Sequence, residues 1–250
     1  MLISGLSSMV KQKENRWRKP AERLKRFADR YFSSTKSGLF FDSAKSVRRQ
    51  FTTFATHVYL TLANFHYGEA FEDESSIQRA LMCVDALERA QGPQGEWPWF
   101  YHAPSGRVMD MYPVYSVHQD GMAPAYLRHA MTHGHPTARE QIVRGFNWII
   151  GNNELDQSML MPEHGIILRS QIRNESHERY KRAIRSVTNW VLRKEGSTIE
   201  ADGLSVNMEC RSYHLGWVLW SFGGQSDFSE LTHHESFNME APLQRNQNGI

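Results

Sequence analysis

Apolar side chains recur every three or four residues through long stretches of this 250-residue chain, and this spacing limits its fold more than any other feature. In VRRQFTTFATHVYLTLANFHYG they form one face of a helix, made of Val47, Phe51, Phe54, Val58, Leu62 and Phe65. We expect this helix to stop at Gly68, because glycine commonly ends helices. A second helix is predicted over SSIQRALMCVDALERAQG, from a serine cap to Gly92. The main part of the chain therefore begins as a helical hairpin.

The same spacing continues toward the C-terminus. We predict further helices at about Asp120 to His133, over 137–151, over 177–194 and from Ser212 onward. The segment 164–172 (HGIILRSQI) is consistent with a short strand or an extended lead-in. With one N-terminal helix this makes about seven helices and almost no alternating strand pattern. The pattern predicts an all-α fold of stacked hairpins, as in solenoids and α/α toroids.

Charge divides the chain unevenly. Residues 1–50 hold 13 Lys/Arg against 4 Asp/Glu, whereas the other 200 residues hold 16 against 23. We therefore separate a basic N-terminal arm with one helix (1–46) from an α-hairpin domain (47–224). The helical spacing is lost over 225–250, which predicts a loose tail. No helix-turn-helix, zinc-finger or RNA-binding signature accompanies the basic charge, so nucleic acid is not an expected partner.

Cysteine content and hydropathy bear on the location of the protein. Cys83 lies in an apolar helical stretch and Cys210 in a polar one, so no disulfide framework is predicted. The opening MLISGLSSMV is too short and too interrupted for a signal peptide, and no apolar run reaches the ~20 residues of a membrane span. We expect a cytoplasmic protein with no membrane span.

The loop after the predicted hairpin contains QGPQGEW, which fits Gln-x-x-x-Gly-x-Trp from Gln91 through Gly95 to Trp97. This stretch resembles the core of the QW motif of squalene and hopene cyclases, which are α/α-toroid proteins. Ala86 stands where that motif has an aromatic residue, and the Asp-rich acid motif of those cyclases is absent. The resemblance therefore implies hairpin packing rather than cyclase chemistry.

Helical hairpins joined by Trp-rich and carboxylate-rich loops also resemble the wider α/α-toroid group, which includes six-hairpin glycosidases and many polysaccharide lyases. In that group, catalytic and sugar-binding residues come from loops and helix starts at one mouth of the ring. A full ring of twelve helices takes more than 250 residues, so the resemblance implies a toroid that is either complete in an abbreviated form or partial. A partial ring leaves apolar helix faces exposed, which favours self-association into a homo-oligomer.

Polar and aromatic residues gather at loop-to-helix junctions. In EWPWFYH, the flat rings of Trp99 and Tyr101 suit stacking against sugars, while Trp97, together with Gln91 earlier in the loop, is expected to tie one hairpin to the next. Two other junctions, YPVYSVHQDGMAP and NMECRSYHLGW, have similar polar compositions before a predicted helix. Their residues of interest are Tyr112, Tyr115, His118, Gln119, Asp120, Glu209, Arg211 and His214. Capping of a helix explains one acidic residue but not this crowding, which predicts one shared site.

The leading hypothesis is a carbohydrate-active enzyme that cleaves a glycosidic bond in a saccharide. In a hydrolase, Asp120 and Glu209 would divide the general acid and base roles. In a lyase, Tyr115 or Tyr112 would act with His118 to remove the proton α to a uronate carboxylate, which Arg211 neutralises. The saccharide-binding residues of either form would be Trp99, Tyr101, Tyr112, Gln119, Arg211 and His214.

Two other classes remain open. One is a glycan- or protein-binding hairpin protein without chemistry, and the other is a terpenoid-cyclase-like enzyme. A zinc site can be drawn from Cys210, His214 and His118, but no metal-binding signature is present, so we expect neither a metal nor another cofactor. The histidines of THGHPT, at 133 and 135, are expected only to form a turn.

Overall fold

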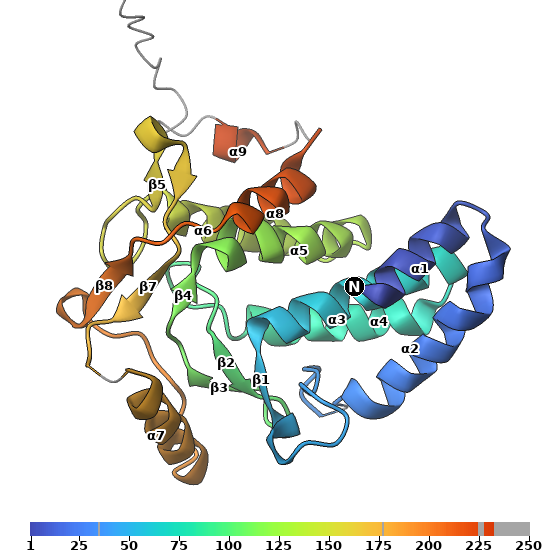
Figure 1. Ribbon diagram of the computed structural model, residues 1–250, viewed down its shortest axis with the longest axis horizontal. Coiled ribbons are helices and arrows are strands. Elements are labelled where there is room, and N and C mark those ends of the chain that lie inside the picture. The colour runs from blue at the N-terminus through green and yellow to red at the C-terminus, as the bar shows by residue number, and fades with distance from the viewer. Residues whose placement is uncertain (35, 177, 225–227, 233–250) are drawn as a thin grey trace, which may run out of the picture.

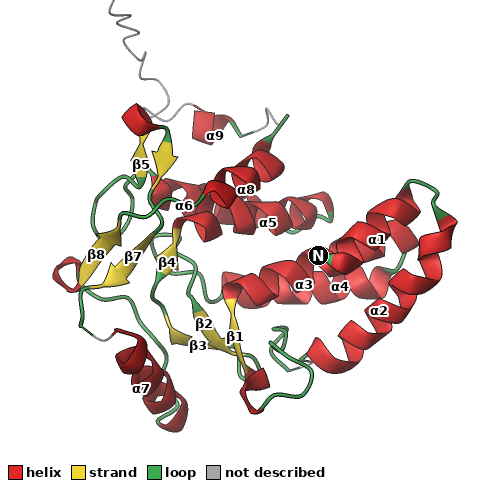
Figure 2. Cartoon of the chain, viewed as in Figure 1, coloured by secondary structure: helices red, strands yellow, loops and turns green. Residues whose placement is uncertain are grey.

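The computed structural model describes residues 1–34, 36–176, 178–224 and 228–232. This part of the chain is mostly helical, as predicted (Figure 2). Its helices are α1 (Leu2–Lys11), α2 (Arg18–Phe32), α3 (Phe54–Phe71), α4 (Glu74–Glu88), α5 (Ala123–Thr132), α6 (Ala138–Ile149), α7 (Glu178–Val191), α8 (Ser212–Phe222) and α9 (Ser229–Thr232). None of these helices combines the length and apolar character that crossing a lipid bilayer demands.

Small antiparallel sheets accompany the helices, so an all-α class is too narrow for this fold. The strands pair in the orders β1–β2–β3, β4–β7–β8 and β5–β6. They are β1 (Phe51–Thr53), β2 (Phe100–His102), β3 (Arg107–Asp110), β4 (Val114–Tyr115), β5 (Leu160–Met161), β6 (Ile166–Ile167), β7 (Ser170–Arg173) and β8 (Leu204–Asn207). Strands of this length are too short for alternating hydropathy to reveal them in the sequence.

The helices and sheets occupy different sides of the molecule (Figure 1). The hairpin α3–α4 lies at the centre, with α1 along α3 and α2 outermost. The hairpin α5–α6 and helix α8 form a second helical group beside it. The strands gather at the other end, and α7 extends beyond them.

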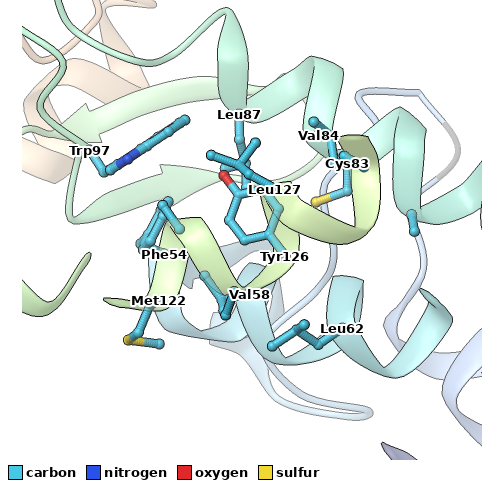
Figure 3. Packing of buried hydrophobic residues seen from close by; sticks show 14 of the residues in the cluster. Phe54, Val58, Leu62, Cys83, Val84, Leu87, Trp97, Met122, Tyr126 and Leu127 are labelled. Atoms are coloured by element: carbon cyan, nitrogen blue, oxygen red, sulfur yellow. The ribbon is translucent and has the colours of Figure 1, made fainter. Parts of the chain in front are cut away.

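The main hydrophobic core lies between α3, α4 and α5 (Figure 3). Phe54, Val58 and Leu62 of α3 are fully buried, at the spacing that the sequence predicts. Burial of each such side chain stabilises the fold by about 1.5–3 kcal/mol. Trp97, from the loop after α4, closes the core by stacking on Phe54 with 5.3 Å between ring centroids. The loop that resembles the QW motif is thus part of the core.

Gln91 connects that loop to the next hairpin. Its amide Nε2 donates to the carbonyl of Gly95 at 2.8 Å and to that of Gln141 in α6 at 3.3 Å. Gly95 has φ +101°, and a Cβ there would lie 2.4 Å from the carbonyl oxygen of Arg144. Glycine therefore allows the loop to lie directly on α6. Gln91 and Trp97 thus join one hairpin to the next, which is the structural role expected for them from the sequence.

Gly68 does not end the first hairpin helix. Helix α3 continues to Phe71, and the chain turns at Glu72, where φ is +56°. A Cβ on Gly68 would lie 2.4 Å from Cδ1 of Ile77, so glycine permits close packing of α3 against α4. Helix α4 then begins at Glu74, with the Asp73 side chain rather than a serine accepting the N–H of Ser75 at 3.2 Å.

The two ends of the chain differ from the expected arm and tail. Residues 1–46 contain two helices, α1 and α2, where the sequence predicts one. Of the predicted tail, 225–227 and 233–250 lie outside the described residues. Phe228 and Leu231, at α9, are buried against the main core.

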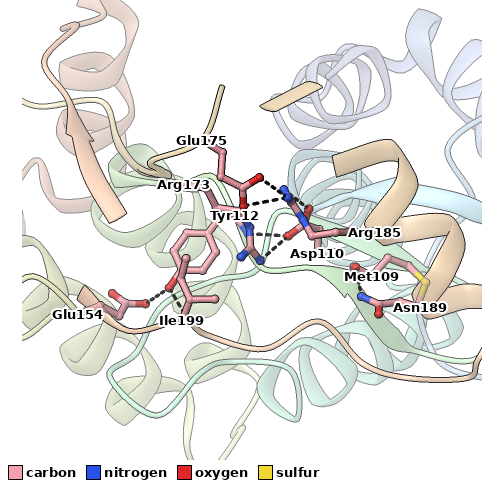
Figure 4. Close-up of polar contacts among 9 residues, drawn as sticks. All are labelled: Met109, Asp110, Tyr112, Glu154, Arg173, Glu175, Arg185, Asn189 and Ile199. Carbon is pink, nitrogen blue, oxygen red and sulfur yellow. Dashed lines mark hydrogen bonds and ion pairs between the residues drawn. The ribbon is translucent and has the colours of Figure 1, made fainter. Parts of the chain in front are cut away.

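A second core surrounds Tyr112 and Trp148 beside the strands. Helix α7 is attached next to it by polar contacts (Figure 4). Asn189 donates from Nδ2 to the carbonyl of Met109 at 3.0 Å, and the Arg185 guanidinium lies 3.6 Å from Asp110. The predicted apolar face of this helix points to solvent, with exposed Tyr180, Ile184, Val187 and Val191. Self-association through such a face remains a prediction.

Candidate functional site

The stretch YPVYSVHQDGMAP forms strand β4, a π-helical turn and the start of α5. The π-helical turn covers His118–Met122, and all its residues are buried. Such turns occur frequently at functional sites. The helical stretch begins at Ser116, four residues before the predicted start at about Asp120, so Asp120 lies inside it and does not cap it. The turn directs the side chain of His118 toward a cleft and that of Asp120 toward α8.

An open cleft of about 460 Å³ lies over this turn, between α3, α8 and strand β4. Its lining consists mainly of aromatic side chains. Besides tyrosines, it contains two ionisable side chains, one histidine and one arginine. The lining residues are Ala55, Tyr59, Trp99, Tyr115, Val117, His118, Met122, Arg169, Tyr213 and Trp217. Hence Trp99, Tyr115 and His118, which the sequence analysis singles out, do converge on one cleft.

The aromatic rings of the lining form two groups. In the first, the ring of Trp99 lies parallel to that of His118 at 6.2 Å and edge-on to that of Tyr115 at 5.2 Å. In the second, the rings of Tyr59 and Trp217 are tilted by 39°, with 5.9 Å between centroids. An aromatic lining of this kind suits a flat ligand with apolar C–H faces.

His118 is the buried titratable group of the cleft. Only 3% of its surface is exposed, and Nδ1 has no hydrogen-bond partner among the described residues. Burial, and secondarily the charge of His214, lowers the pKa of His118 to about 3. The imidazole is therefore neutral near pH 7 and is a weak base.

Asp120 pairs with His214 beneath the cleft. The Asp120 carboxylate accepts from His214 Nε2 at 2.5 Å, and both side chains are buried. Burial raises the pKa of Asp120, and the hydrogen bond from His214 opposes that rise. The pair joins the second and third predicted junctions, as their similar composition suggests.

Helix α8 packs closely on the π-helical turn beside that pair. The Ser221 hydroxyl donates to the carbonyl of Gly121 at 2.7 Å. A Cβ on Gly121 would lie 2.7 Å from Cβ of Trp217. Glycine at 121 therefore allows Trp217 to reach the cleft wall.

Arg169 is a cleft residue that the sequence analysis missed. Its guanidinium carbon lies 5.6 Å from the centroid of Tyr115, and its Nε is buried with no hydrogen-bond partner in the described part of the chain. Its Nη1 donates to Glu209. The one sequence feature that could have indicated Arg169 is that it is a single arginine within the apolar, strand-like segment 164–172.

Glu209 and Arg211 lie at the edge of the site rather than in its lining. Arg211 Nη2 donates to Glu209 Oε2 at 2.8 Å, and both side chains are about half exposed. The hydrogen bond from Arg169 is the first of several contacts that lower the pKa of Glu209. Neither Glu209 nor Asp120 lines the cleft, so the two carboxylates do not flank a common ligand position.

The remaining predicted residues support the site from outside or lie elsewhere. Gln119 is buried and donates from Nε2 to the carbonyl of Tyr115 at 3.2 Å, which fixes the turn. Tyr101 is buried in the main core, edge-on to His57 at 5.2 Å. Tyr112 is in the second core, where its hydroxyl donates to Glu154 at 3.1 Å (Figure 4). Neither tyrosine contributes to the cleft lining.

Cys210, His214 and His118, the three residues considered for a zinc site, do not bring their ligand atoms together. Among the described residues, one group of at least three metal-ligand side chains has its ligand atoms mutually within 4.8 Å, and it consists of Asp85, Glu88 and His135. Cys210 is exposed, and His214 Nε2 is engaged by Asp120.

No protein-family model and no curated protein sequence matches this chain.

Proposed function

We propose that this chain is a carbohydrate-active lyase that acts on an acidic saccharide, carried on a partial α/α-toroid arrangement of hairpins. The observation that carries the proposal is the placement of Arg169 beside Tyr115 and His118 in an aromatic-walled cleft. The stacked hairpins α3–α4 and α5–α6, tied by the Gln91 loop, support the toroid part.

The walls of the cleft match the chemistry of a sugar. A pyranose ring presents apolar C–H groups on its faces and hydroxyls at its rim. Trp99 and Trp217 offer flat surfaces to such faces. A volume of about 460 Å³ is within the usual range for small-ligand sites, about 300–1,000 Å³.

Arg169 gives the preference for an acid. A guanidinium binds a carboxylate through two parallel N–H···O bonds. In the observed structure one such position is occupied by Glu209, and the buried Nε has no partner among the described residues. A substrate carboxylate would replace Glu209 and use both donors. The role that the sequence analysis gives to Arg211 thus passes to Arg169.

The reaction is a β-elimination. Arg169 stabilises the negative charge that develops on the uronate carboxylate as the α C–H bond breaks. Tyr115 and His118 divide the removal of that proton and the delivery of a proton to the leaving oxygen. The C–H electron pair becomes the new C=C bond as the bond to the β oxygen breaks, so that no water is consumed.

Hydrolysis is less well supported. It requires two carboxyl groups about 5–9.5 Å apart on opposite sides of the scissile bond. Asp120 is bound to His214 beneath the cleft, and Glu209 is paired with arginines at its edge. Neither carboxylate faces the ligand position.

A non-catalytic acidic-glycan binder is the second candidate. The low pKa of His118, about 3, favours it, because a base works best when its pKa is near the working pH. The same aromatic walls and the same arginine would serve binding alone.

The test is an incubation with acidic polysaccharides of several uronate types and with their neutral counterparts. New reducing ends and the ultraviolet absorbance of unsaturated uronates are followed together. We expect both signals from wild type, and a loss of at least about 100-fold in Tyr115→Phe and His118→Ala. Tyr180→Phe, on the exposed face of α7, is the matched control.

Reducing ends without absorbance would contradict the lyase proposal and return the choice to hydrolysis. Binding of an acidic glycan with neither signal would favour the second candidate. Absorbance that survives both cleft variants would place the chemistry elsewhere.

A further inference from the structure

Four side chains outside the cleft form a histidine-rich cluster between α3 and α5. Helix α3 supplies His66 and Glu69, three residues apart, α5 supplies His129, and His133 follows directly after the last residue of α5, Thr132. Residues three apart share one face of a helix, so His66 and Glu69 lie together on the side of α3 that contacts His129. From the sequence alone, His133 is expected only to form a turn, and the other three residues carry no expectation.

The central contact joins two imidazole nitrogens. His66 Nε2 and His129 Nε2 lie 3.2 Å apart. In a tetrahedral zinc site with Zn–N bonds of about 2.0–2.1 Å, two ligand nitrogens are about 3.3 Å apart. The two rings hydrogen-bond to each other at this distance, and the same separation fits two nitrogens that share a metal ion.

Glu69 fixes the chemical form of His129. Its Oε1 accepts from His129 Nδ1 at 2.6 Å. Nδ1 therefore carries a proton, and Nε2 is the nitrogen that a neutral imidazole leaves for a metal ion. A carboxylate that orients the far nitrogen of a histidine is the usual outer partner of a metal-bound imidazole.

The other members of the cluster hold this arrangement without competing for the ion. Lys11 Nζ lies 3.4 Å from Glu69 Oε2, and His133 Nε2 lies 3.4 Å from Oε1, so both Glu69 oxygens are engaged within the protein. The ring of Phe65 stacks on His129 and on His133, each at 5.6 Å.

Space for the remaining ligands adjoins His129. A hollow of about 290 Å³ is lined by Ala125, Arg128, His129, Thr132, Trp220 and Ser221. Water molecules there can complete a tetrahedral shell around an ion held by two histidines. Imidazole ligands select zinc and its neighbours among the divalent transition metals over magnesium or calcium.

We propose that His66 Nε2 and His129 Nε2 bind one zinc-like divalent transition-metal ion, oriented by Glu69, which clips α3 to α5. The site is separate from the cleft residues and does not depend on the proposed lyase activity. The ion would join two helices of the main core and so stabilise the folded state.

The test is a titration of the chelator-treated full chain with zinc chloride, read by competition with a chromophoric chelator and by the melting temperature. We expect one zinc per chain and a higher melting temperature in zinc. His66→Gln and His129→Gln should each lose binding, and Glu69→Gln should weaken it by about 10–100-fold. His135→Gln is the matched control, because His135 belongs to the separate Asp85–Glu88–His135 group. Circular dichroism verifies that each variant is folded.

A second readout needs no variant. On zinc addition, the imidazole nitrogen resonances of His66 and His129 in the wild-type protein should shift, and those of exposed His164 should not. The proposal is overturned if zinc binding survives His66→Gln and His129→Gln, or if it is lost in His135→Gln instead. It is also overturned if no stoichiometric binding occurs, since the two rings would then only hydrogen-bond to each other.

Discussion

Two pairs of a carboxylate and a basic side chain border the cleft, and their surroundings differ. The Asp120–His214 pair is sealed beneath it, with 1% and 4% of the side chains exposed. The Arg169–Glu209 pair lies at its mouth, with 27% and 51% exposed. Loss of one partner from a buried pair leaves a polar group without solvent, whereas an exposed group is rehydrated. The buried pair therefore fixes the structure of the site, and the exposed pair remains exchangeable with a ligand.

The largest expected effect is on the buried pair. Asp120→Ala or His214→Ala should each lower the free energy of unfolding by about 3–5 kcal/mol, because each leaves the other group buried and unpaired. The double variant should lose less than the sum of the two. Urea denaturation measures all three values. Single-variant losses below about 1 kcal/mol would remove the distinction between the pairs.

Glu96 extends the comparison to a buried carboxyl that forms no ion pair within the described part of the chain. Burial, and secondarily the charge of Glu154, raises its pKa from 4.5 to about 7. The contribution of protonated Glu96 to the free energy of unfolding is therefore fully present below pH 4.5 and is lost as the pH rises through 7. That loss is on the order of 3 kcal/mol, at about 1.4 kcal/mol per pKa unit.

Glu96→Gln should remove this pH dependence and exceed wild type in stability at pH 8. Urea denaturation at pH 5 and pH 8 measures it, with exposed Glu163→Gln as the control. If the wild-type and Glu96→Gln curves shift equally between the two pH values, the carboxyl is not held protonated by burial.

The next effect concerns the cationic member of the exposed pair. Arg169→Ala should lower kcat/KM for acidic-saccharide cleavage by about 100-fold, with the urea midpoint nearly unchanged. Arg169→Lys keeps the charge but loses two-point recognition and should recover only part of the rate. Arg211→Ala, which removes a cation outside the lining, is the control. An equal loss in Arg169→Ala and Arg211→Ala would indicate a general charge effect.

The smallest effect is expected at Glu209. Glu209→Gln should leave the urea midpoint within error, because its carboxylate is exposed. The variant should bind acidic saccharides a few-fold more tightly, since the competing carboxylate on Arg169 is gone. High salt should reduce this difference. Weaker binding by Glu209→Gln would mean that Glu209 contacts the ligand instead of competing with it.

Much of the helical fold follows from apolar spacing, whereas the finer features do not. Phe54, Val58 and Leu62 are buried as their spacing predicts. Gly68 misleads because a glycine that allows close helix packing looks the same in the sequence as one that ends a helix. A short strand was one of two alternatives for 164–172, where β6 and most of β7 lie, and the other strands escape detection because two to four residues carry no readable period.

Part of the candidate site is also predictable from local sequence patterns. Local crowding indicates His118 and Asp120, and repeated composition connects them with His214. Arg169 is missed because the residues just before it in the sequence are apolar and include no other candidate binding or catalytic side chain. Its position next to Tyr115 arises only when β4 pairs with β7, where Tyr115 lies opposite Ser170. Pairing over such a distance is decided by the whole fold.

The most direct test of the account is to measure the affinity of the wild-type protein for an oligouronate and for its methyl ester, side by side. The ester keeps the sugar faces that stack on Trp99 but removes the charge that Arg169 recognises. We predict that the acid binds at least about 10-fold more tightly, and that Arg169→Ala abolishes this preference while leaving the affinity for the ester unchanged. Equal affinity of wild type for the acid and the ester would contradict the claim that this cleft selects an acidic saccharide.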